Sequence, residues 1–277
     1  MKTRTLRIVN SVQYFWKSAH TEKIDKALIK YITIYRGVIY NGIVFVIWVP
    51  IIILRRYPFQ ALYPELKYSY EIFGMMQLTQ YSYDTLVLTA SDCFFLGSAF
   101  LLYGQFHALN HKLSNIGGAT AAQMHKDIRS CIQHHKLLLQ LTYDLASLYK
   151  FGLAVQVMTT TIAICTEMFV WDERNLPSKI QSSIYLVFLL IQLSFYCFSI
   201  EMLTNEAMET SNAIFHSQWY TDFKFAKTYV QAIIRRSQKP IIFTAGGVIV
   251  INKATFTSIL KSTFSLYTFL NDVRDDK

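Results

Sequence analysis

The sequence predicts an all-α polytopic membrane protein: a helix bundle with about five transmembrane helices and a helical anchor region in the cytosol. Hydrophobic residues make up 52% of the 277 residues and charged residues only 16%, whereas soluble domains carry roughly 25% charged residues. The apolar residues are also grouped in runs that approach the ~17–25 residues needed to cross a bilayer. Together these observations favour a membrane protein over a large soluble core.

The first segment, 1–36, is basic and amphipathic. It holds eight Lys or Arg residues, and its apolar residues recur at helical spacing. We expect a cytosolic segment that lies near the membrane surface. Its start shows no cleavable signal peptide, because no apolar run follows the first charged residues.

The segment 37–103 is predicted to hold the first two spans. Val38–Leu54 is free of charge, and the Pro- and aromatic-rich stretch after it is typical of a loop. Thr85–Tyr103 is the second span and contains Asp92. Because an ionisable group inside a membrane is costly, two roles stay open for Asp92: a buried hydrogen-bonding group, or a group that lines a cavity.

The middle of the chain alternates between cytosolic helix and membrane. Residues 104–150 show one apolar helical face and predict a cytosolic helical anchor. The segment 151–203 holds the third and fourth spans, and the second of these, Ile180–Ile200, is the longest charge-free run in the chain. Residues 204–239 are again polar and helical, and we expect them in the cytosol.

The last segment, 240–277, is predicted to be a C-terminal helix with a short external tail. Pro240 should break the helix before it, since proline lacks an N–H and disfavours helix in the preceding residue. One face of the following helix carries small polar residues and then an aromatic one: Asn252, Thr255, Ser258, Ser262, Ser265 and Phe269. Such a stripe either packs against another helix or lines water.

Orientation follows from the basic residues. The expected cytosolic segments hold 18 Lys or Arg and the expected outer segments hold seven. This bias places the N-terminus in the cytosol and, after five spans, the C-terminus outside the cell.

Catalytic and metal-binding patterns do not appear in the sequence. The four cysteines form no close pair, and the histidines lack further ligands at zinc-binding spacing. Nucleophile elbows, zinc-protease motifs and phosphate-binding loops are missing as well. We therefore expect no enzyme, no metal and no cofactor. The net charge of +9 is spread between apolar spans, so we expect no nucleic-acid partner.

The C-terminal 80 residues carry a specific pattern of residues. The run Arg236-Ser237-Gln238-Lys239-Pro240 is followed by Thr244-Ala245-Gly246, Thr255-Phe256, Lys261, Ser265 and Leu270. In order and spacing this pattern resembles the C-terminal signature of the insect odorant receptors. Upstream, Tyr196-Cys197, Glu201, Leu203, Ala207 and Trp219 are similar to that family's sixth helix and the following loop. The loop after Leu54 is similar to the family's outer loop after its third helix.

The resemblance implies a function and a set of partners. It implies an odorant receptor subunit of a heteromeric, odorant-gated, non-selective cation channel in the plasma membrane of sensory neurons. The subunit would form a heterotetramer with a shared co-receptor, in a lipid bilayer, and would bind a small volatile odorant. The family has seven spans, so the first two helices would be absent here. Alternatives are a gustatory-type chemoreceptor channel, an incomplete or non-functional receptor fragment, and a secondary transporter, although no internal repeat supports the last.

The resemblance also implies site residues. The odorant-binding candidates lie in the outer halves of the spans: Phe45, Trp48, Val87, Thr89, Tyr185 and Phe188. The stripe from Asn252 to Phe269 would line the pore, and the apolar outer end of the stripe would close the pore. The residues that would contact other subunits during assembly are Trp219, Ser237, Gln238, Lys239 and Pro240.

Overall fold

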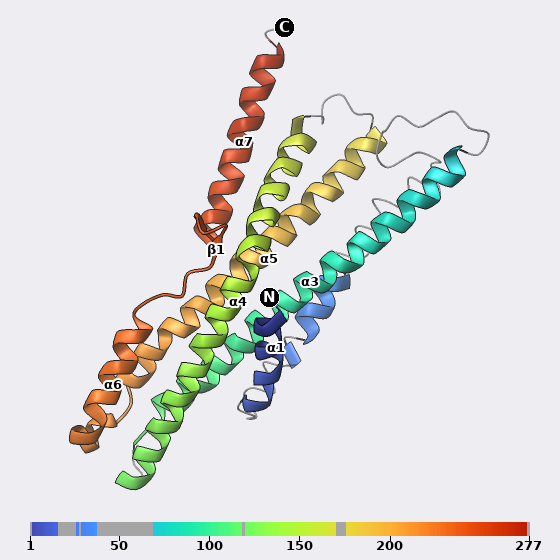
Figure 1. Ribbon diagram of the computed structural model, residues 1–277. Coiled ribbons are helices and arrows are strands. Elements are labelled where there is room, and N and C mark those ends of the chain that lie inside the picture. Colours follow the sequence, from blue (N-terminus) through green and yellow to red (C-terminus); the bar gives the residue numbers. More distant parts are fainter. Residues whose placement is uncertain are drawn as a thin grey trace. The chain divides into compact units, whose positions relative to one another are not determined.

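A computed structural model of the chain describes residues 2–15, 26–27, 29–37, 69–117, 120–169 and 176–275. Almost all of these residues are helical (Figure 1). The elements are α1 (Lys2–Ser11), η1 (Val12–Tyr14), α3 (Ser69–Ser114), α4 (Ala121–Phe169), α5 (Leu176–Phe215), η2 (Trp219–Asp222), α6 (Phe223–Ser237), β1 (Thr244–Ala245), β2 (Ile249–Val250) and α7 (Lys253–Asp275). The all-α class predicted from the sequence is confirmed.

The chain forms two compact units. Unit 1 comprises 1–30, 95–157 and 195–257, and unit 2 comprises 31–94, 158–194 and 258–277. The helices α3, α4, α5 and α7 each contribute one segment to each unit. We describe the two units separately.

Three of the described helices are long and apolar enough to cross a membrane: α3, α4 and α5. They contain three of the five predicted spans, at 85–103, 151–166 and 180–200. The first predicted span, Val38–Leu54, lies outside the described residues. The last helix, α7, has 23 residues but does not reach the hydropathy of the other three, in agreement with its polar stripe.

The end of α3 and the residues up to Gly117 are held by hydrogen bonds and one glycine conformation. The Asn115 side chain donates to the carbonyl of His111 and closes the end of α3. Gly117 follows with a φ of 129°, a conformation that glycine adopts without steric cost. The carbonyl of Ile116 then accepts a hydrogen bond from the Gln218 N–H, 3.0 Å away. The residues that follow α3 are thereby attached to the segment that follows α5.

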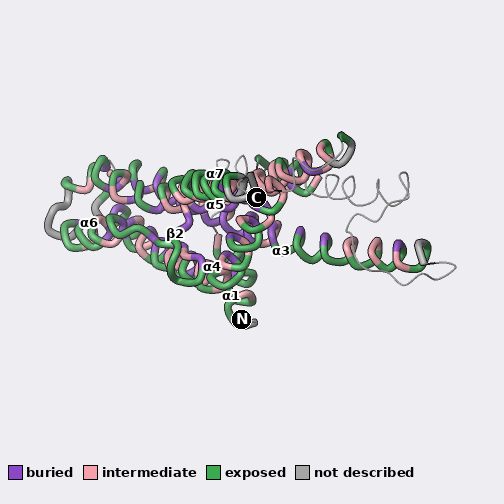
Figure 2. Tube along the Cα trace, turned by 90° about the horizontal axis from the view of Figure 1, so that it is seen from above, coloured by how far each residue is buried: buried purple, intermediate pink, exposed green. Residues whose placement is uncertain are grey.

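The core of unit 1 lies between α3, α4, α5 and α6. Buried residues recur along the facing sides of these helices, whereas their outer sides are exposed (Figure 2). The fully buried side chains include Phe106, Leu109, Leu141, Leu203 and Ile214. Such residues recur every three or four positions, as expected for one face of each helix. This packing gives the anchor region predicted for 104–150 a core of its own.

The N-terminal helix α1 is attached to α4 by charged groups. Arg7 donates to the Asp144 carboxylate at 2.9 Å, and Arg4 contacts both Asp144 and the Ser147 hydroxyl. Ile8 is buried on the same helix. This basic segment therefore packs on protein within unit 1, while its exposed apolar residues, such as Leu6 and Val9, face outward.

The segment after Pro240 differs from the sequence prediction. The helix α6 ends at Ser237, close to the predicted break, and the Arg236 side chain donates to the Lys239 carbonyl beyond it. A two-stranded antiparallel hairpin then pairs Thr244 with Val250. The helix α7 begins only at Lys253 and has 23 residues. It is therefore about two fifths shorter than the 38-residue segment 240–277, which was predicted to hold the C-terminal helix and a short external tail. Tertiary contacts hold the hairpin, as described below.

Candidate functional site

The structure places the described odorant-binding candidates in unit 2, on α3 and α5. Thr89 is buried, Tyr185 and Phe188 are half-buried, and Val87 is exposed. Phe45 and Trp48 lie outside the described residues. Val87 and Thr89 therefore face different environments, as expected for helix positions about 200° apart.

Asp92 joins three segments of unit 2. Tyr35, on the helical segment 29–37, donates its hydroxyl to Asp92 Oδ2 at 2.6 Å, and the Gln192 amide of α5 donates to the same oxygen at 2.8 Å. Asp92 is 3% exposed and Tyr35 is fully buried. The buried hydrogen-bonding role left open by the sequence is thus observed, and Gln192 and Tyr35 are site residues that sequence reasoning missed.

A second carboxylate in unit 2 links α4 to α5. The Ser182 hydroxyl donates to Glu167 Oε2 at 2.6 Å, and Ser182 is 2% exposed. Glu167 lies near the end of α4, beyond the predicted span 151–166. A buried serine that bonds a carboxylate on a neighbouring helix fixes the register of the two helices. No sequence pattern predicts this pair, because its two members lie on different helices.

The start of α7 is capped from two sides in unit 1. Asn252 Oδ1 accepts a hydrogen bond from the Thr255 N–H at 2.8 Å, which makes Asn252 the N-cap residue. Glu201 of α5 accepts from the Lys253 N–H at 2.7 Å and pairs with the Lys253 ammonium at 3.5 Å. A carboxylate at a helix N-terminus also interacts favourably with the positive end of the helix dipole. Asn252 was predicted to be the first residue of the polar stripe on the C-terminal helix. In the structure it lies one residue before α7 and caps this helix.

Part of the stripe that was predicted to line the pore lies on the surface of α7. Ser258, Ser262, Ser265 and Phe269 are exposed, and Phe269 is 61% exposed. Thr263, on the other side of α7, is buried and donates to the Ile259 carbonyl. Among the described residues, these four side chains therefore form an exposed face of α7.

The hairpin before α7 is held by α4 and by an aromatic cluster. The Gly246 N–H donates to the Lys150 carbonyl at 2.9 Å. Phe243, next to the first strand, is buried and lies edge-on to Phe95, which also contacts Tyr149 and Tyr196. Aromatic contacts of this kind add to the free energy of apolar burial. Movements of α4 or α5 in unit 1 would consequently act on the residues that begin α7.

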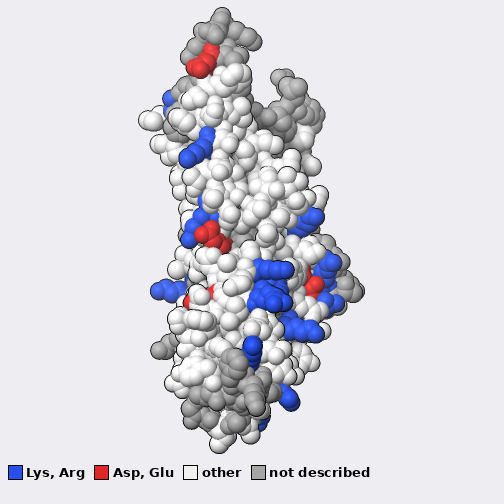
Figure 3. All heavy atoms as spheres, turned by 90° about the vertical axis from the view of Figure 1, so that its left-hand side faces the viewer, with Lys and Arg blue, Asp and Glu red and all other residues white. Residues whose placement is uncertain are grey.

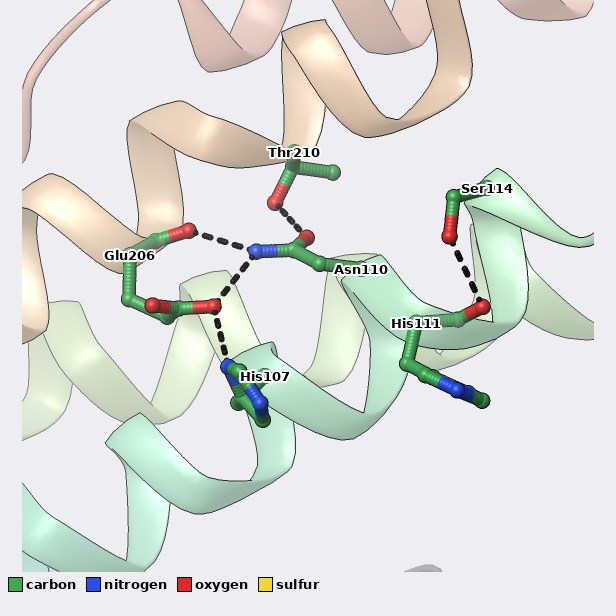
Figure 4. A network of polar contacts seen from close by, with 6 residues as sticks. All are labelled: His107, Asn110, His111, Ser114, Glu206 and Thr210. Atoms are coloured by element: carbon green, nitrogen blue, oxygen red, sulfur yellow. Dashed lines mark hydrogen bonds and ion pairs between the residues drawn. The ribbon is translucent and has the colours of Figure 1, made fainter. Parts of the chain in front are cut away.

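A polar network connects α3 and α5 in the anchor region (Figure 4). Asn110 donates to both the backbone carbonyl and the carboxylate of Glu206, each at 2.9 Å, and accepts from the Thr210 hydroxyl at 2.8 Å. His107 Nδ1 lies 3.0 Å from the same carboxylate. Figure 4 shows His111 pointing away from this network. His107 and His111 share a helix face in the sequence, but only His107 reaches Glu206.

Two further histidines are buried in the part of α4 that precedes the predicted span 151–166. His134 Nε2 lies 3.1 Å from Gln105 Oε1, and His135 packs edge-on against Phe106. Burial lowers the pKa of His134 to about 4, with Lys112 and His135 adding to the shift. Burial also lowers the pKa of His135 to about 4, with a contribution from Arg236. Both imidazoles are therefore neutral at pH 7.

The assembly candidates lie around α6. Trp219 begins η2 and is half-buried. Ser237, the last residue of α6, is buried, whereas Gln238, Lys239 and Pro240 are exposed. Arg236 also donates to the Tyr143 hydroxyl of α4 at 2.6 Å. The exposed turn after α6 is thus presented by a helix that is itself fixed to the anchor core.

Within the described ranges, no group of three or more His, Cys, Asp or Glu side chains is arranged to hold a metal ion.

The comparison with protein families decides the classification. The family model described as "7tm Odorant receptor" matches residues 6–264. The chain belongs to the odorant receptor family. Its membership accounts for the resemblance in the C-terminal 80 residues and extends that resemblance over nearly the whole chain. The family is one of receptors and channels and not of enzymes.

Individual relatives support the same classification. This odorant receptor is 24% identical to Odorant receptor 98a of Drosophila melanogaster over 62% of its own length and 46% of that protein. It is 22% identical to Odorant receptor 43b of the same species over 80% of its length and 58% of that protein. It is 24% identical to Odorant receptor Or2 of Anopheles gambiae over 61% of its length and 47% of that protein. The chain thus spans about half the length of the curated relatives it matches.

Solved structures share its fold. The insect olfactory receptor OR5 from Machilis hrabei, in complex with eugenol, superposes with a TM-score of 0.82 at 13% identity, over 96% of this chain and 74% of that one. The structure of the same receptor without a named ligand gives a TM-score of 0.83 over 98% of this chain and 75% of that one. The chain therefore shares this fold. Its family and its three apolar helices of membrane length make it a multi-pass membrane protein.

Proposed function

We propose that this odorant receptor is a subunit of a heteromeric, odorant-gated, non-selective cation channel. The observation that carries the proposal is the family match over residues 6–264 together with the shared fold of an insect olfactory receptor that binds eugenol. The ligand would be a small volatile odorant, and the partner a shared co-receptor subunit in a heterotetramer.

The odorant would bind in unit 2 among the outer halves of the spans. Thr89, Tyr185 and Phe188 lie on two helices of this unit and combine one buried hydroxyl with two aromatic rings. Ligand sites for mostly apolar molecules have this composition: an apolar lining with few polar groups. Phe45, Trp48 and Val87 complete the proposed set.

The pore would be lined by α7. The exposed face that carries Ser258, Ser262 and Ser265 is polar, and Phe269 closes it at its outer end with an apolar ring. Small hydroxyls suit a water-filled path, and apolar constrictions close pores by dewetting. Lys253 bonds Glu201, which keeps this cation engaged with α5. Asn252 and Thr255 would stand at the inner entrance.

The channel would reside in the plasma membrane with a cytosolic N-terminus and an extracellular C-terminus. The basic residues are concentrated in the expected cytosolic segments. On the face drawn in Figure 3, Lys and Arg atoms gather in groups separated by largely uncharged surface. Trp219 and the turn from Ser237 to Pro240 would contact partner subunits from the cytosolic side.

A direct test expresses the full-length receptor with a co-receptor and records whole-cell currents during odorant application. We expect odorant-evoked currents that reverse near 0 mV in mixed Na⁺ and K⁺ solutions and persist when G-protein signalling is blocked. Cells with the co-receptor alone serve as the control. Currents that require a second messenger, or responses that never depend on the receptor subunit, would contradict the channel proposal.

The pore assignment is tested separately by cysteine substitution along α7 with a water-soluble thiol reagent. Modification of the current should be strongest at Ser258, Ser262, Ser265 and Phe269. It should be weak at Leu260, Thr263 and Tyr267. A flat or inverted profile would return the stripe to helix packing.

A further inference from the structure

The hairpin of β1 and β2, which lies between α6 and α7 (Figure 1), presents apolar side chains at the surface. Val248 in its turn is 85% exposed, and Ile249 and Val250 of the second strand are each 42% exposed. Ile242, just before the first strand, is 54% exposed. Single exposed apolar residues are ordinary, whereas a group of them close together is typical of an interaction site.

The hairpin is attached to α4 at the predicted start of a membrane span. The Gly246 N–H donates to the Lys150 carbonyl at 2.9 Å, and a Cβ on Gly246 would lie 3.5 Å from Ala154 Cβ. Lys150 is the last residue before the predicted span 151–166. Phe151, the first residue of that span, is 78% exposed. Within unit 1, the apolar patch is therefore level with the predicted boundary between membrane and cytosol.

The charged residues of this region are positive. The 35 residues 223–257 hold six Lys or Arg and no Asp or Glu. The side chains of Lys150 and Lys239 are exposed, and neither forms an ion pair with a described residue. The Lys150 ammonium lies against the hairpin turn, 2.8 Å from the position that a Cβ on Gly247 would take. A cation thus stands directly beside the apolar patch.

Arg236 adds a positioned cation on the same side of α4. It donates to the Tyr143 hydroxyl at 2.6 Å and to the Lys239 carbonyl at 3.1 Å, and it lies over the Tyr143 ring. These two bonds leave further N–H donors of the guanidinium for an acceptor. Tyr143 and Lys150 are seven residues apart, so they share a side of α4 at a spacing of about 10 Å. We call Lys150, Arg236 and Lys239 the basic surface.

The charges on the adjoining helices favour a lipid over a second copy of this chain. Asp144 of α4 already binds two arginines of α1, and Glu201 of α5 pairs with Lys253. A second copy that offered its own stretch 223–257 would bring only further positive charge. The cytosolic leaflet, by contrast, carries anionic lipids, and basic pockets beside membrane helices bind their phosphorylated headgroups.

We propose that the basic surface and the hairpin together bind an acidic phospholipid of the cytosolic leaflet, of the phosphoinositide class. Lys150, Arg236 and Lys239 contact the phosphate groups, and Val248 and Ile249 lie among the acyl chains. A headgroup with several phosphates matches three cations on one surface, whereas a singly charged headgroup neutralises only one of them. The inference rests on the proposed orientation, which places the anchor region in the cytosol.

The test measures the melting temperature of the purified full-length receptor with its co-receptor in an uncharged detergent. Short-chain phosphatidylinositol bisphosphate is titrated beside phosphatidylserine and phosphatidylcholine with the same acyl chains. The apparent affinity should be highest for the bisphosphate and lowest for phosphatidylcholine. Free inositol trisphosphate, which has no acyl chains, should bind more weakly than the bisphosphate lipid, because the apolar patch then contributes nothing. Equal affinities for the three lipids would overturn the inference.

Receptor variants locate the lipid. A lysine near an anionic surface contributes about fivefold in affinity, so Lys150→Gln combined with Lys239→Gln should weaken binding of the bisphosphate about 25-fold. Lys126→Gln is the matched control, since Lys126 is an exposed lysine of α4 that lies 24 residues earlier, about 36 Å along the helix axis. Its affinity should equal that of the wild type. Val248→Ser should weaken binding of the lipid but not of inositol trisphosphate.

Further measurements separate lipid binding from other roles of the surface. Both lysine side chains are exposed, so the melting temperature of the double variant without lipid should stay at the wild-type value. If the double variant does not fold, Lys239→Gln alone should show a loss of about fivefold. Wild-type lipid affinity in the variant, or loss of the co-receptor on co-purification with lipid affinity intact, would contradict the inference. A receptor that binds the bisphosphate here but gives no odorant-evoked current would contradict the channel proposal alone.

Discussion

At the scale of single residues, Gly117 determines how α3 turns into α4. Its φ of 129° is one that residues with a Cβ rarely adopt, and a Cβ there would lie 2.4 Å from Gln218 Cβ. We predict that Gly117→Ala destabilises the receptor by about 1–3 kcal/mol, the usual cost of strained backbone at such a position. The melting temperature of the purified full-length receptor measures the effect.

The control for this prediction is Gly152→Ala. Gly152 is helical, and a Cβ there would meet its nearest atom at an ordinary 3.9 Å. Alanine is favoured over glycine in a helix by about 1 kcal/mol, so this change should leave the melting temperature unchanged or raise it. Equal effects of the two substitutions would show that the turn at Gly117 tolerates a side chain.

The buried histidines of α4 predict a dependence of stability on pH. The pKa values of His134 and His135 fall to about 4 in the folded state, from about 6.5 in the unfolded chain. Between these values the unfolded chain binds protons that the folded chain does not. Their contribution to stability is therefore complete above pH 6.5 and is lost as the pH falls toward 4. Melting temperatures measured from pH 7.5 to pH 5 should decline.

A variant identifies the source of that decline. His135 packs against Phe106 and has an unpartnered Nε2 among the described residues, so His135→Phe replaces a buried titrating group with an apolar ring. The decline in melting temperature with acid should become shallower. An unchanged slope would mean that the carboxylates of the protein, and not these imidazoles, cause it.

At the scale of elements, the start of α7 depends on its cap. Asn252→Ala removes the acceptor of the Thr255 N–H and should weaken the first turn by about 1 kcal/mol. Hydrogen–deuterium exchange of peptides covering 253–257 should become several times faster. Thr257→Ala is the control, since it removes an exposed hydroxyl of the same turn that caps nothing. Unchanged exchange in Asn252→Ala would mean that Glu201 alone holds the turn.

At the scale of the whole molecule, we predict that Trp219 takes part in subunit contact. Large half-buried aromatic residues at the centre of an interface often contribute most of the binding free energy. Trp219→Ala should reduce co-purification of the co-receptor several-fold while surface expression of the receptor is measured in parallel. Tyr220→Ala is the matched control, because Tyr220 is a neighbouring aromatic residue that is 63% exposed. Full recovery of the co-receptor with Trp219→Ala would exclude this role.

Membrane orientation is a second prediction at this scale. Basic residues favour cytosolic positions, so a tag inserted between α3 and α4 should stain only after permeabilisation, and a tag after Lys277 should stain on intact cells. A tag in the stretch 171–175, between α4 and α5, should also stain on intact cells. Staining of the α3–α4 tag on intact cells would invert the orientation.

Sequence patterns alone predicted those features that depend on local chemistry. Apolar runs of membrane length predicted the helices that became α3, α4 and α5, because a backbone in lipid must satisfy its own hydrogen bonds. Pro240 predicted the end of α6, because its ring and missing N–H act on its nearest neighbours. The C-terminal residue pattern was sufficient to indicate the odorant receptor family.

Tertiary structure decided the features that depend on residues far apart in the chain. The hairpin 244–250 has strands of two residues each, too short for a sequence signal, and is held by the Lys150 carbonyl and by the burial of Phe243. Asp92 accepts hydrogen bonds from Tyr35 and Gln192, which lie 57 and 100 residues away in the sequence. Spacing placed Asn252 in the polar stripe of the C-terminal helix, whereas in the structure it is the N-cap residue of α7. Sequence periodicity predicts which residues share a helix face. Hydrogen-bond partners on different helices depend instead on tertiary packing, which brings helix faces that are distant in the sequence into contact.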